Sequence, residues 1–258
     1  MALGALQGPT ELLPVSSSGH LSLIPELLGR PNEELDPELL KAFEVALHAG
    51  TAAALLIALR GEIALELRGL TARRALHAVL AFAPPAAAGL LLERPIERRL
   101  GGPRSVAGAQ VVAGLLLAIA DRRPATRGRR DASSLDHLLM GIAQAAALAP
   151  GVSRNGASLT VLRARRLRHR TANELSRHAA LPIIVGATAL KGTRLARRGV
   201  PPEFVAALGA GTAASFVSTL GSAPLIRVMD GAGSYLAPAV YRVVLGAYAL
   251  LARRHLNA

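Results

Sequence analysis

The chain contains no cysteine and no tryptophan, and aromatic residues make up only 3% of its 258 residues. The absence of cysteine excludes disulfide bonds and metal sites built on thiolates. The formal net charge is +13, which by itself would suit a nucleic-acid partner. The scarcity of aromatic side chains argues against that partner, because single-stranded bases are held largely by stacking on aromatic rings. No nucleic-acid function is therefore expected.

Apolar sequence is what the chain has in abundance, with 51% hydrophobic residues and a mean hydropathy of +0.36. Long runs of Ala, Leu, Val and Gly alternate with short arginine-rich clusters, which is the pattern of a polytopic helical membrane protein. The opening residues MALGALQG lack a basic stretch, so no cleavable signal peptide is expected. The composition thus predicts an all-α integral membrane protein.

Six of the apolar runs are plausible membrane spans. They cover Leu39–Leu59, Ala75–Leu92, Val106–Ala120, 178–193, 203–226 and 234–252. Pro84 and Pro85 fall inside the second run and are expected to kink it.

The charges of the loops predict which side of the membrane each loop occupies. Loops 60–74 and 121–131 are strongly basic and are assigned to the cytoplasm by the positive-inside rule. The acidic loop 30–41 and the mixed-charge loop 94–104 then lie outside. The arginines of 194–198 would also fall outside, against the rule, and the sequence leaves that conflict open.

The segment Gln7–His20, QGPTELLPVSSSGH, concentrates polar groups within apolar sequence. A helix carrying Glu11 should stop or kink near Pro14, and a second helix should start near Gly19 after a serine cap. A helix N-terminus with free amides and hydroxyls suits phosphate, and His20 adds a group that carries protons near neutral pH. The alternative is an ordinary serine cap beside a solvated glutamate and histidine.

A second cluster, PGVSRNGAS at 150–158, has the same character. The apolar run Leu135–Leu148 before it is too short to cross a hydrocarbon core of about 30 Å comfortably. A basic run follows at Arg163–Arg170. Entering from the cytoplasm, turning at mid-depth and returning to a cytoplasmic basic loop fits a re-entrant hairpin.

Arg154 is the only charged residue between Asp136 and Arg163. An arginine within such apolar sequence is energetically costly and indicates a functional site. Its guanidinium group matches two oxygens of a phosphate. The alternative is a structural salt bridge to Glu11 or Glu44.

The two broken segments also resemble each other. An apolar half-helix, a proline, a turn of small and hydroxyl residues and a second half-helix occur at 3–28 and again at 135–162. Paired broken helices predict an inverted repeat with halves of roughly 1–120 and 121–258, and a site where the breaks meet. Chance similarity in Ala- and Leu-rich sequence is the alternative.

QGPTELLPVSSSGHL and PGVSRNGAS resemble the two signature motifs of the bacterial undecaprenyl-diphosphate phosphatases, integral-membrane enzymes associated with bacitracin resistance. The resemblance extends to FEVALHAG at 43–50, to the span containing Leu181-Pro182, and to PAVYRVVLGA at 238–247. It therefore covers most of the chain.

This resemblance implies a single membrane domain over 1–258, with six spanning helices and two re-entrant hairpins in an inverted repeat. It implies hydrolysis of undecaprenyl diphosphate to undecaprenyl phosphate and inorganic phosphate, which recycles the lipid carrier for cell-wall synthesis. The expected location is the bacterial plasma (inner) membrane, with the active site facing outward. The expected partners are the polyprenyl diphosphate lipid, a divalent cation (Mg²⁺ or Ca²⁺) and a second copy in a homodimer.

The resemblance also assigns roles to residues of this chain. The expected catalytic residues are an essential acid, a nucleophile, a histidine and a phosphate-binding arginine, which are Glu11, Ser17, His20 and Arg154. Glu11 is also the expected metal ligand. The expected substrate-binding residues are Gln7, Ser16, Ser18, Gly19, Ser153, Asn155, Gly156 and Ser158.

Three positions depart from the family pattern. Gln7 stands where a glutamate is frequent, Pro9 where a leucine is usual, and Asn155 where a serine follows the arginine. The expected catalytic residues Glu11, His20 and Arg154 are all retained, so activity is expected.

As a mechanism, Arg154 and the backbone amides would hold the diphosphate while Ser17 attacks and His20 accepts its proton. Glu11 would orient His20 or bind the cation. Direct attack by water is equally compatible with the sequence. So is a different class, a transporter that flips the polyprenyl phosphate through the same site, although a carrier does not need a Ser–His–Glu set. An inactive paralogue that keeps the fold is a third reading.

Glu44 and His48 lie four residues apart on one helical face. They are interpreted as a packed polar pair, with a role in the site as the alternative. The remaining histidines are interpreted as loop or interface residues: His77, His137, His169, His178 and His255.

Overall fold

The computed structural model describes residues 1–29 and 37–256, and within these ranges the chain forms helices and no strand. This confirms the all-α prediction. The acidic loop expected at 30–41 lies mostly outside the described residues, and the next helix begins at Pro37.

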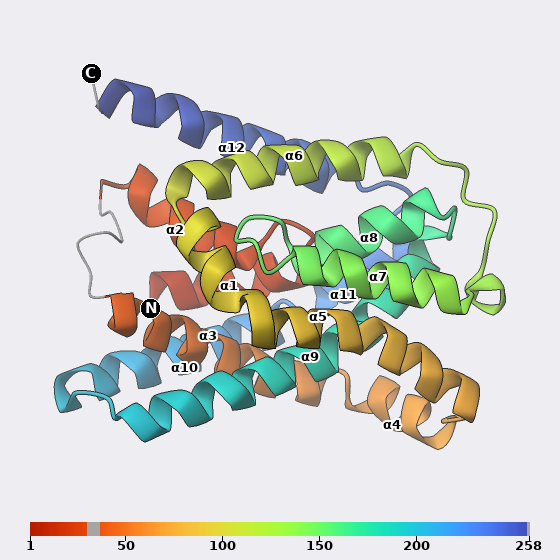
Figure 1. Cartoon of the computed structure of the whole chain (residues 1–258), viewed down its shortest axis with the longest axis horizontal. Coiled ribbons are helices and arrows are strands. Elements are labelled where there is room, and N and C mark those ends of the chain that lie inside the picture. Colours follow the sequence, from red (N-terminus) through yellow and green to blue (C-terminus); the bar gives the residue numbers. More distant parts are fainter. Residues whose placement is uncertain (30–36, 257–258) are drawn as a thin grey trace.

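Six long helices and six short ones make up the described fold (Figure 1). The long helices are α3 (Pro37–Ala58), α5 (Ala72–Leu100), α6 (Pro103–Asp121), α9 (His169–Arg198), α10 (Pro202–Gly221) and α12 (Leu236–Leu256). The short helices are α1 (Ala2–Leu12), α2 (Ser17–Leu27), α4 (Arg60–Arg68), α7 (Ser134–Ala146), α8 (Arg154–Ala164) and α11 (Pro224–Gly231). A 3₁₀ turn, Arg129–Asp131, precedes α7.

Four of the long helices, α3, α5, α6 and α10, are long and apolar enough to cross a membrane. A fifth candidate arises if α11 and α12, which meet at a bend of 110°, are counted together as one span. Helix α9 is more polar, but its 30 residues correspond to about 45 Å, which exceeds a hydrocarbon core of about 30 Å. Large apolar side chains such as Val79, Leu91 and Val217 are exposed on these helices, as expected for a surface that faces lipid.

The two re-entrant hairpins are α1–α2 and α7–α8. In Figure 1 they enter from opposite ends of the molecule and turn in its interior. Helix α1 packs against α10, and α7 packs against α5. Each hairpin thus rests on a long helix of the other half of the chain, which is the arrangement of an inverted repeat.

Helices α6 and α12 pack closely against each other along one edge of the molecule (Figure 1). A Cβ atom on Gly114 would lie 2.9 Å from the carbonyl oxygen of Ala239, and one on Gly246 would lie 2.5 Å from the carbonyl oxygen of Ala107. Any larger residue at either glycine would separate the helices. In one contact a glycine of α6 faces a carbonyl oxygen of α12, and in the other a glycine of α12 faces a carbonyl oxygen of α6.

Several helices extend beyond the expected spans, so some segments predicted as loops are helical. The mixed-charge loop expected at 94–104 is mostly the end of α5, and much of the basic run Arg163–Arg170 belongs to α8 and α9. An ion pair of 2.6 Å between Glu93 of α5 and Lys191 of α9 connects these two helices near their ends. Charged residues that indicated a loop in the sequence therefore form an ion pair between two helices in the structure.

The end of α9 lies at the same end of the molecule as the α5–α6 connection (Figure 1). The arginines of 194–198 are thus on the side that the sequence placed outside. Arg194 pairs with Glu93 at 3.3 Å. This ion pair offsets part of the positive charge that conflicts with the positive-inside rule.

Candidate active site

The helix breaks at 13–16 and 147–153 have the same local geometry. Ser16 (φ 75°, ψ 98°) and Ser153 (φ 66°, ψ 114°) both adopt positive φ angles, which are uncommon for residues other than glycine. The hydroxyl of Ser16 accepts the amide proton of Gly19 at 3.2 Å, and that of Ser153 accepts the amide proton of Gly156 at 3.1 Å. Both predicted serine caps are therefore present, and each strained serine starts a helix.

Glu11, Ser17 and Arg154 meet where the two breaks come together. Ser17 is the first residue of α2 and Arg154 the first residue of α8. The Ser17 hydroxyl donates to Glu11 Oε2 at 2.7 Å, and the Arg154 guanidinium donates to Glu11 Oε1. Arg154 Nη1 also donates to the carbonyl oxygen of Ala180 in α9 at 3.0 Å.

This cluster is largely removed from solvent, with side-chain exposures of 7% for Glu11 and 19% for Arg154. The salt bridge to Glu11 that was the alternative for Arg154 is thus present. It links residues 143 positions apart in the sequence. A buried ion pair whose members also contact a reactive hydroxyl can serve the site as well as the fold.

His20 has partners other than those expected. Its Nδ1 lies 2.7 Å from the Ser16 carbonyl oxygen, and its Nε2 lies 2.6 Å from the hydroxyl of Tyr241, whose ring stacks on the imidazole. A carbonyl oxygen can only accept, so Nδ1 carries the proton and Nε2 of the neutral ring accepts from Tyr241. The Ser17 hydroxyl is bonded to Glu11 instead, so the geometry couples Ser17 to the carboxylate and not to the imidazole.

Asn155 joins the two hairpins. Its amide nitrogen donates to the Leu12 carbonyl oxygen at 3.0 Å, and its amide oxygen accepts from the hydroxyl of Ser176 at 2.9 Å. Both ends of the side chain are therefore occupied by protein, which gives Asn155 a structural contact in addition to the substrate role expected of it.

The other expected substrate-binding residues lie at or near the breaks. Ser18 Oγ lies 3.3 Å from Ser16 Oγ. The two amide atoms of Gln7 and the hydroxyl of Ser158 are buried with no hydrogen-bond partner among the described residues. Buried polar atoms without partners are uncommon in proteins, so water or substrate is expected to satisfy them.

Two residues that the sequence reasoning missed, Gln110 of α6 and Arg242 of α12, hold both breaks. Gln110 Nε2 donates to the Val15 carbonyl oxygen at 2.9 Å. Arg242 Nη2 donates to the carbonyl oxygens of Gly151 at 2.9 Å and Val152 at 2.7 Å. Its Nε donates to Gln110 Oε1 at 2.9 Å, and both side chains are fully buried.

Glycine at the first turn of α2 and α8 makes these contacts possible. A Cβ atom on Gly19 would lie 2.5 Å from Gln110 Nε2, and one on Gly156 would overlap Arg242 Nη1. The signal for Arg242 was available in the sequence, because it is the only charged residue between Asp230 and Arg253. The same reasoning that singled out Arg154 applies to it.

His48 faces the site, whereas Glu44 is bonded through its backbone. His48 Nδ1 lies 2.8 Å from the Glu44 carbonyl oxygen, and the imidazole is close enough to Glu11 to interact with it electrostatically. His48 therefore lies beside the catalytic cluster, in addition to its contact with Glu44.

The described residues contain no group of three or more His, Asp or Glu side chains that could hold a metal ion. Glu11 is the carboxylate in the cluster, and both of its oxygens already accept hydrogen bonds. Mg²⁺ commonly binds through one or two carboxylates together with the phosphates of a substrate. The site therefore fits a cation that arrives with a diphosphate and does not fit a preformed metal cage.

The buried cluster brings together the N-termini of two helices, the Arg154 guanidinium, the Glu11 carboxylate and the Ser17 hydroxyl. Helix N-termini and arginine bind phosphate oxygens, and the carboxylate can accept the proton of the serine. This set can bind a phosphate group and transfer it.

Comparison with known proteins agrees with this chemistry. The family model described as "Bacitracin resistance protein BacA" matches residues 1–248. A protein of Geobacter sulfurreducens named undecaprenyl-diphosphatase is 40% identical over 264 residues, covering 97% of this chain and 95% of that protein. Proteins of the same name from Geobacter metallireducens (38% identical, 96% of this chain, 95% of that protein) and Hahella chejuensis (33%, 96% and 94%) are similar over comparable lengths.

Proposed function

This chain belongs to the bacitracin resistance protein BacA family, and from this premise we propose that Glu11, Ser17 and Arg154 carry out its reaction. The protein is a membrane enzyme that hydrolyses undecaprenyl diphosphate to undecaprenyl phosphate and inorganic phosphate. The observation that supports this assignment of residues is the hydrogen bond of 2.7 Å from Ser17 to a carboxylate that also binds Arg154. A carrier that only flips the lipid needs no serine bonded to a buried base.

The diphosphate enters between the N-termini of α2 and α8, where Arg154 exchanges part of its contact with Glu11 for phosphate oxygens. Ser17 Oγ attacks the terminal phosphorus and gives its proton to Glu11. The bond from that phosphorus to the bridging oxygen breaks, and undecaprenyl phosphate departs with the electron pair.

The serine then carries the phosphate as an ester. Glu11 passes its proton to the departing phosphate and is ionised again, so it can accept a proton from the water that attacks the phosphoserine. Oγ leaves phosphorus, regains a proton from Glu11, and inorganic phosphate is released. His20, held by Ser16 and Tyr241, lines the site and keeps the Ser16 turn in place.

A divalent cation, Mg²⁺ or Ca²⁺, would bind with the diphosphate and reduce the negative charge on its oxygens. Glu11 is the residue of this cluster that would hold it. The hydroxyls of Ser16, Ser17 and Ser18 are the nearby oxygen atoms that could complete its coordination together with the substrate.

The enzyme occupies the bacterial plasma membrane with the α4 end of the molecule in the cytoplasm. The segments 68–74 and 122–133 at that end contain three and five arginines, and arginine retains loops on the cytoplasmic side. The hairpin α1–α2 then enters from the outer side, so the active site is reached from outside.

The test is phosphate release from undecaprenyl diphosphate by the purified protein in detergent, with Mg²⁺ and with a chelator. Ser17→Ala should lower the rate by about 10²-fold or more, because the nucleophile and its proton transfer are both lost. Ser105→Ala, a partly buried serine of α6, is the matched control and should leave the rate unchanged. Full activity of Ser17→Ala would overturn the assignment of Ser17.

A further inference from the structure

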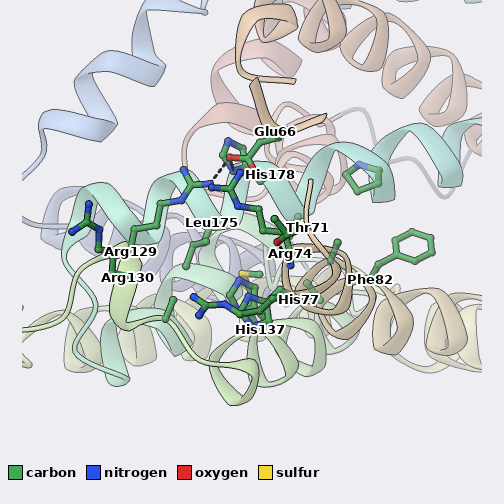
Figure 2. A pocket seen from close by; sticks show the side chains of 17 residues that line it. Glu66, Thr71, Arg74, His77, Phe82, Arg129, Arg130, His137, Leu175 and His178 are labelled. Atoms are coloured by element: carbon green, nitrogen blue, oxygen red, sulfur yellow. Dashed lines mark hydrogen bonds and ion pairs between the residues drawn. The ribbon is translucent and has the colours of Figure 1, made fainter. Parts of the chain in front are cut away.

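A cavity of about 640 Å³ lies at the arginine-rich end of the molecule. It is lined by residues of α4, the first half of α5, α7 and α9, together with Arg129, Arg130 and Ala132 (Figure 2). None of the residues of the catalytic cluster lines it. The reaction proposed above therefore leaves this cavity without a role.

The lining is strongly basic. Four arginines border the cavity, and Glu66 is the only acidic residue among the lining residues, which leaves an excess of three positive charges. The arginines are Arg73, Arg74, Arg129 and Arg130. Figure 2 labels Arg74, Arg129 and Arg130 among the side chains that line the cavity.

Two of the arginines have their charge engaged by the protein, and two do not. Arg129 forms ion pairs with Glu66 and, at 3.6 Å, with Glu174, and Arg74 donates to the Gly69 carbonyl oxygen at 2.8 Å. Within the described part of the chain, Arg73 and Arg130 have no ion pair or side-chain hydrogen bond. Both residues are exposed, so two guanidinium groups are available for an external anion.

A pair of histidines in the cavity lining offers further polar contacts. The rings of His77 and His137 stack with their centroids 4.1 Å apart. His77 Nε2 lies 3.2 Å from the Ser134 hydroxyl, and His137 Nδ1 lies 2.9 Å from the Ser133 carbonyl oxygen. Imidazole nitrogens beside arginines can add hydrogen bonds to the oxygens of a bound anion.

The far wall of the cavity is apolar. Met140, Leu175 and Pro182 line it, and Phe82, which is 40% exposed, points away from the arginines toward the outer face of α5 in Figure 2. That face carries exposed apolar residues and lies in a membrane-spanning helix. A ligand with an anionic head and an apolar tail would therefore match the cavity in both parts.

We propose that this cavity binds a phosphate group at the cytoplasmic face of the membrane, carried by an anionic phospholipid whose chains lie along α5. Basic pockets between membrane helices on the cytoplasmic side recognise such headgroups, and arginine binds their phosphate oxygens through paired hydrogen bonds. Inorganic phosphate offers the same chemistry without the apolar tail. The site is additional to the phosphatase reaction and does not depend on it.

Native mass spectrometry of the delipidated full chain tests this, with phosphatidylglycerol, phosphatidylcholine and inorganic phosphate as separate probes. We expect phosphatidylglycerol to be retained better than phosphatidylcholine, and Arg73→Ala/Arg130→Ala to weaken its retention by about tenfold or more. Arg68→Ala/Arg104→Ala removes the same charge from exposed positions outside the cavity and is the matched control. Unchanged phosphatase activity in both double variants shows that they are folded.

A second variant separates the cavity from surface charge. Ala78→Trp fills the space without changing the charge and should weaken binding of phosphatidylglycerol as the arginine variant does. Competition by inorganic phosphate would support binding through the phosphate group. Weaker binding of inorganic phosphate than of phosphatidylglycerol would show that the site prefers a phosphate group carried by a lipid. Equal losses in the cavity and control variants, equal retention of both phospholipids, or no effect of Ala78→Trp would overturn the proposal.

Discussion

At the scale of single residues, the catalytic cluster depends on contacts between positions far apart in the chain. Glu11, Ser17 and Arg154 could be chosen from the sequence because each is a polar or charged residue in an unusual apolar setting. Their partners could not be chosen in the same way. Whether Ser17 bonds to His20 or to Glu11 depends on how α1 and α2 turn at the break, and on Tyr241, which is 221 residues from His20.

Arg242 is the residue whose loss should be felt most widely. It donates to carbonyl oxygens of the second break and to Gln110, and these acceptors are buried. Each buried acceptor left without a donor costs about 1–3 kcal/mol. Arg242→Met should therefore lower the stability by about 3 kcal/mol or more and reduce kcat, because both helix breaks lose their support.

Thermal unfolding in detergent and phosphate release measure the two effects of this variant. Arg227→Met, at an exposed position of α11 in the same half of the chain, is the control and should change neither quantity. An Arg242→Met protein as stable and as active as the wild type would show that the breaks hold their shape without this side chain.

At the scale of helices, the breaks could be predicted and the helix lengths could not. Proline and serine signals placed the end of α1 and the start of α2 within about two residues, which is typical of helix boundaries. Helices α5 and α9 run past their apolar sequence because Glu93 pairs with Lys191 and Arg194 across them. Such pairing depends on which helices are neighbours, and that information is absent from the local sequence.

The glycines in the first turns of α2 and α8 give a test at this scale. Gly19→Ala and Gly156→Ala would push a methyl group onto Gln110 and Arg242, so each should lower stability and activity. Overpacking of this kind typically costs about 1–3 kcal/mol. The measurements are the unfolding temperature and the rate of phosphate release.

Gly108→Ala is the matched control, because a Cβ atom there would meet nothing within 4 Å. Alanine is the better helix former, so this variant should be as stable as the wild type or slightly more stable. If Gly19→Ala and Gly156→Ala behaved like Gly108→Ala, the close approach of Gln110 and Arg242 to the helix starts would not be required.

At the scale of the whole molecule, the hairpins α1–α2 and α7–α8 lie at opposite ends, and each packs on a long helix that is distant in the sequence (Figure 1). The repeated pattern at 3–28 and 135–162 predicted the two broken helices, and the division into repeat halves stays a prediction. The sequence could not predict that α6 and α12 pack through Gly114 and Gly246, because that contact joins positions more than a hundred residues apart. The predicted span 178–193 is also shorter than α9, because charged residues at both ends of this 30-residue helix lie outside the apolar run.

The absence of cysteine makes the orientation easy to test. Gly102 and Gly128 lie in connections at opposite ends of the molecule, and each can be replaced by cysteine without a close contact. In intact cells stripped of their outer envelope, a membrane-impermeant maleimide should label Gly102→Cys directly. It should label Gly128→Cys only after the membrane is permeabilised, and the reverse pattern would contradict the proposed orientation.

The most direct test of the catalytic cluster is a double-mutant cycle in which kcat/KM for undecaprenyl diphosphate is measured for the wild type, Glu11→Gln, Ser17→Ala and the double variant. If Glu11 accepts the proton of Ser17, each single change lowers kcat/KM by about 10²-fold or more, and the double variant is no worse than the weaker single variant. Independent losses that multiply in the double variant, or a single variant with wild-type kcat/KM, would contradict the account.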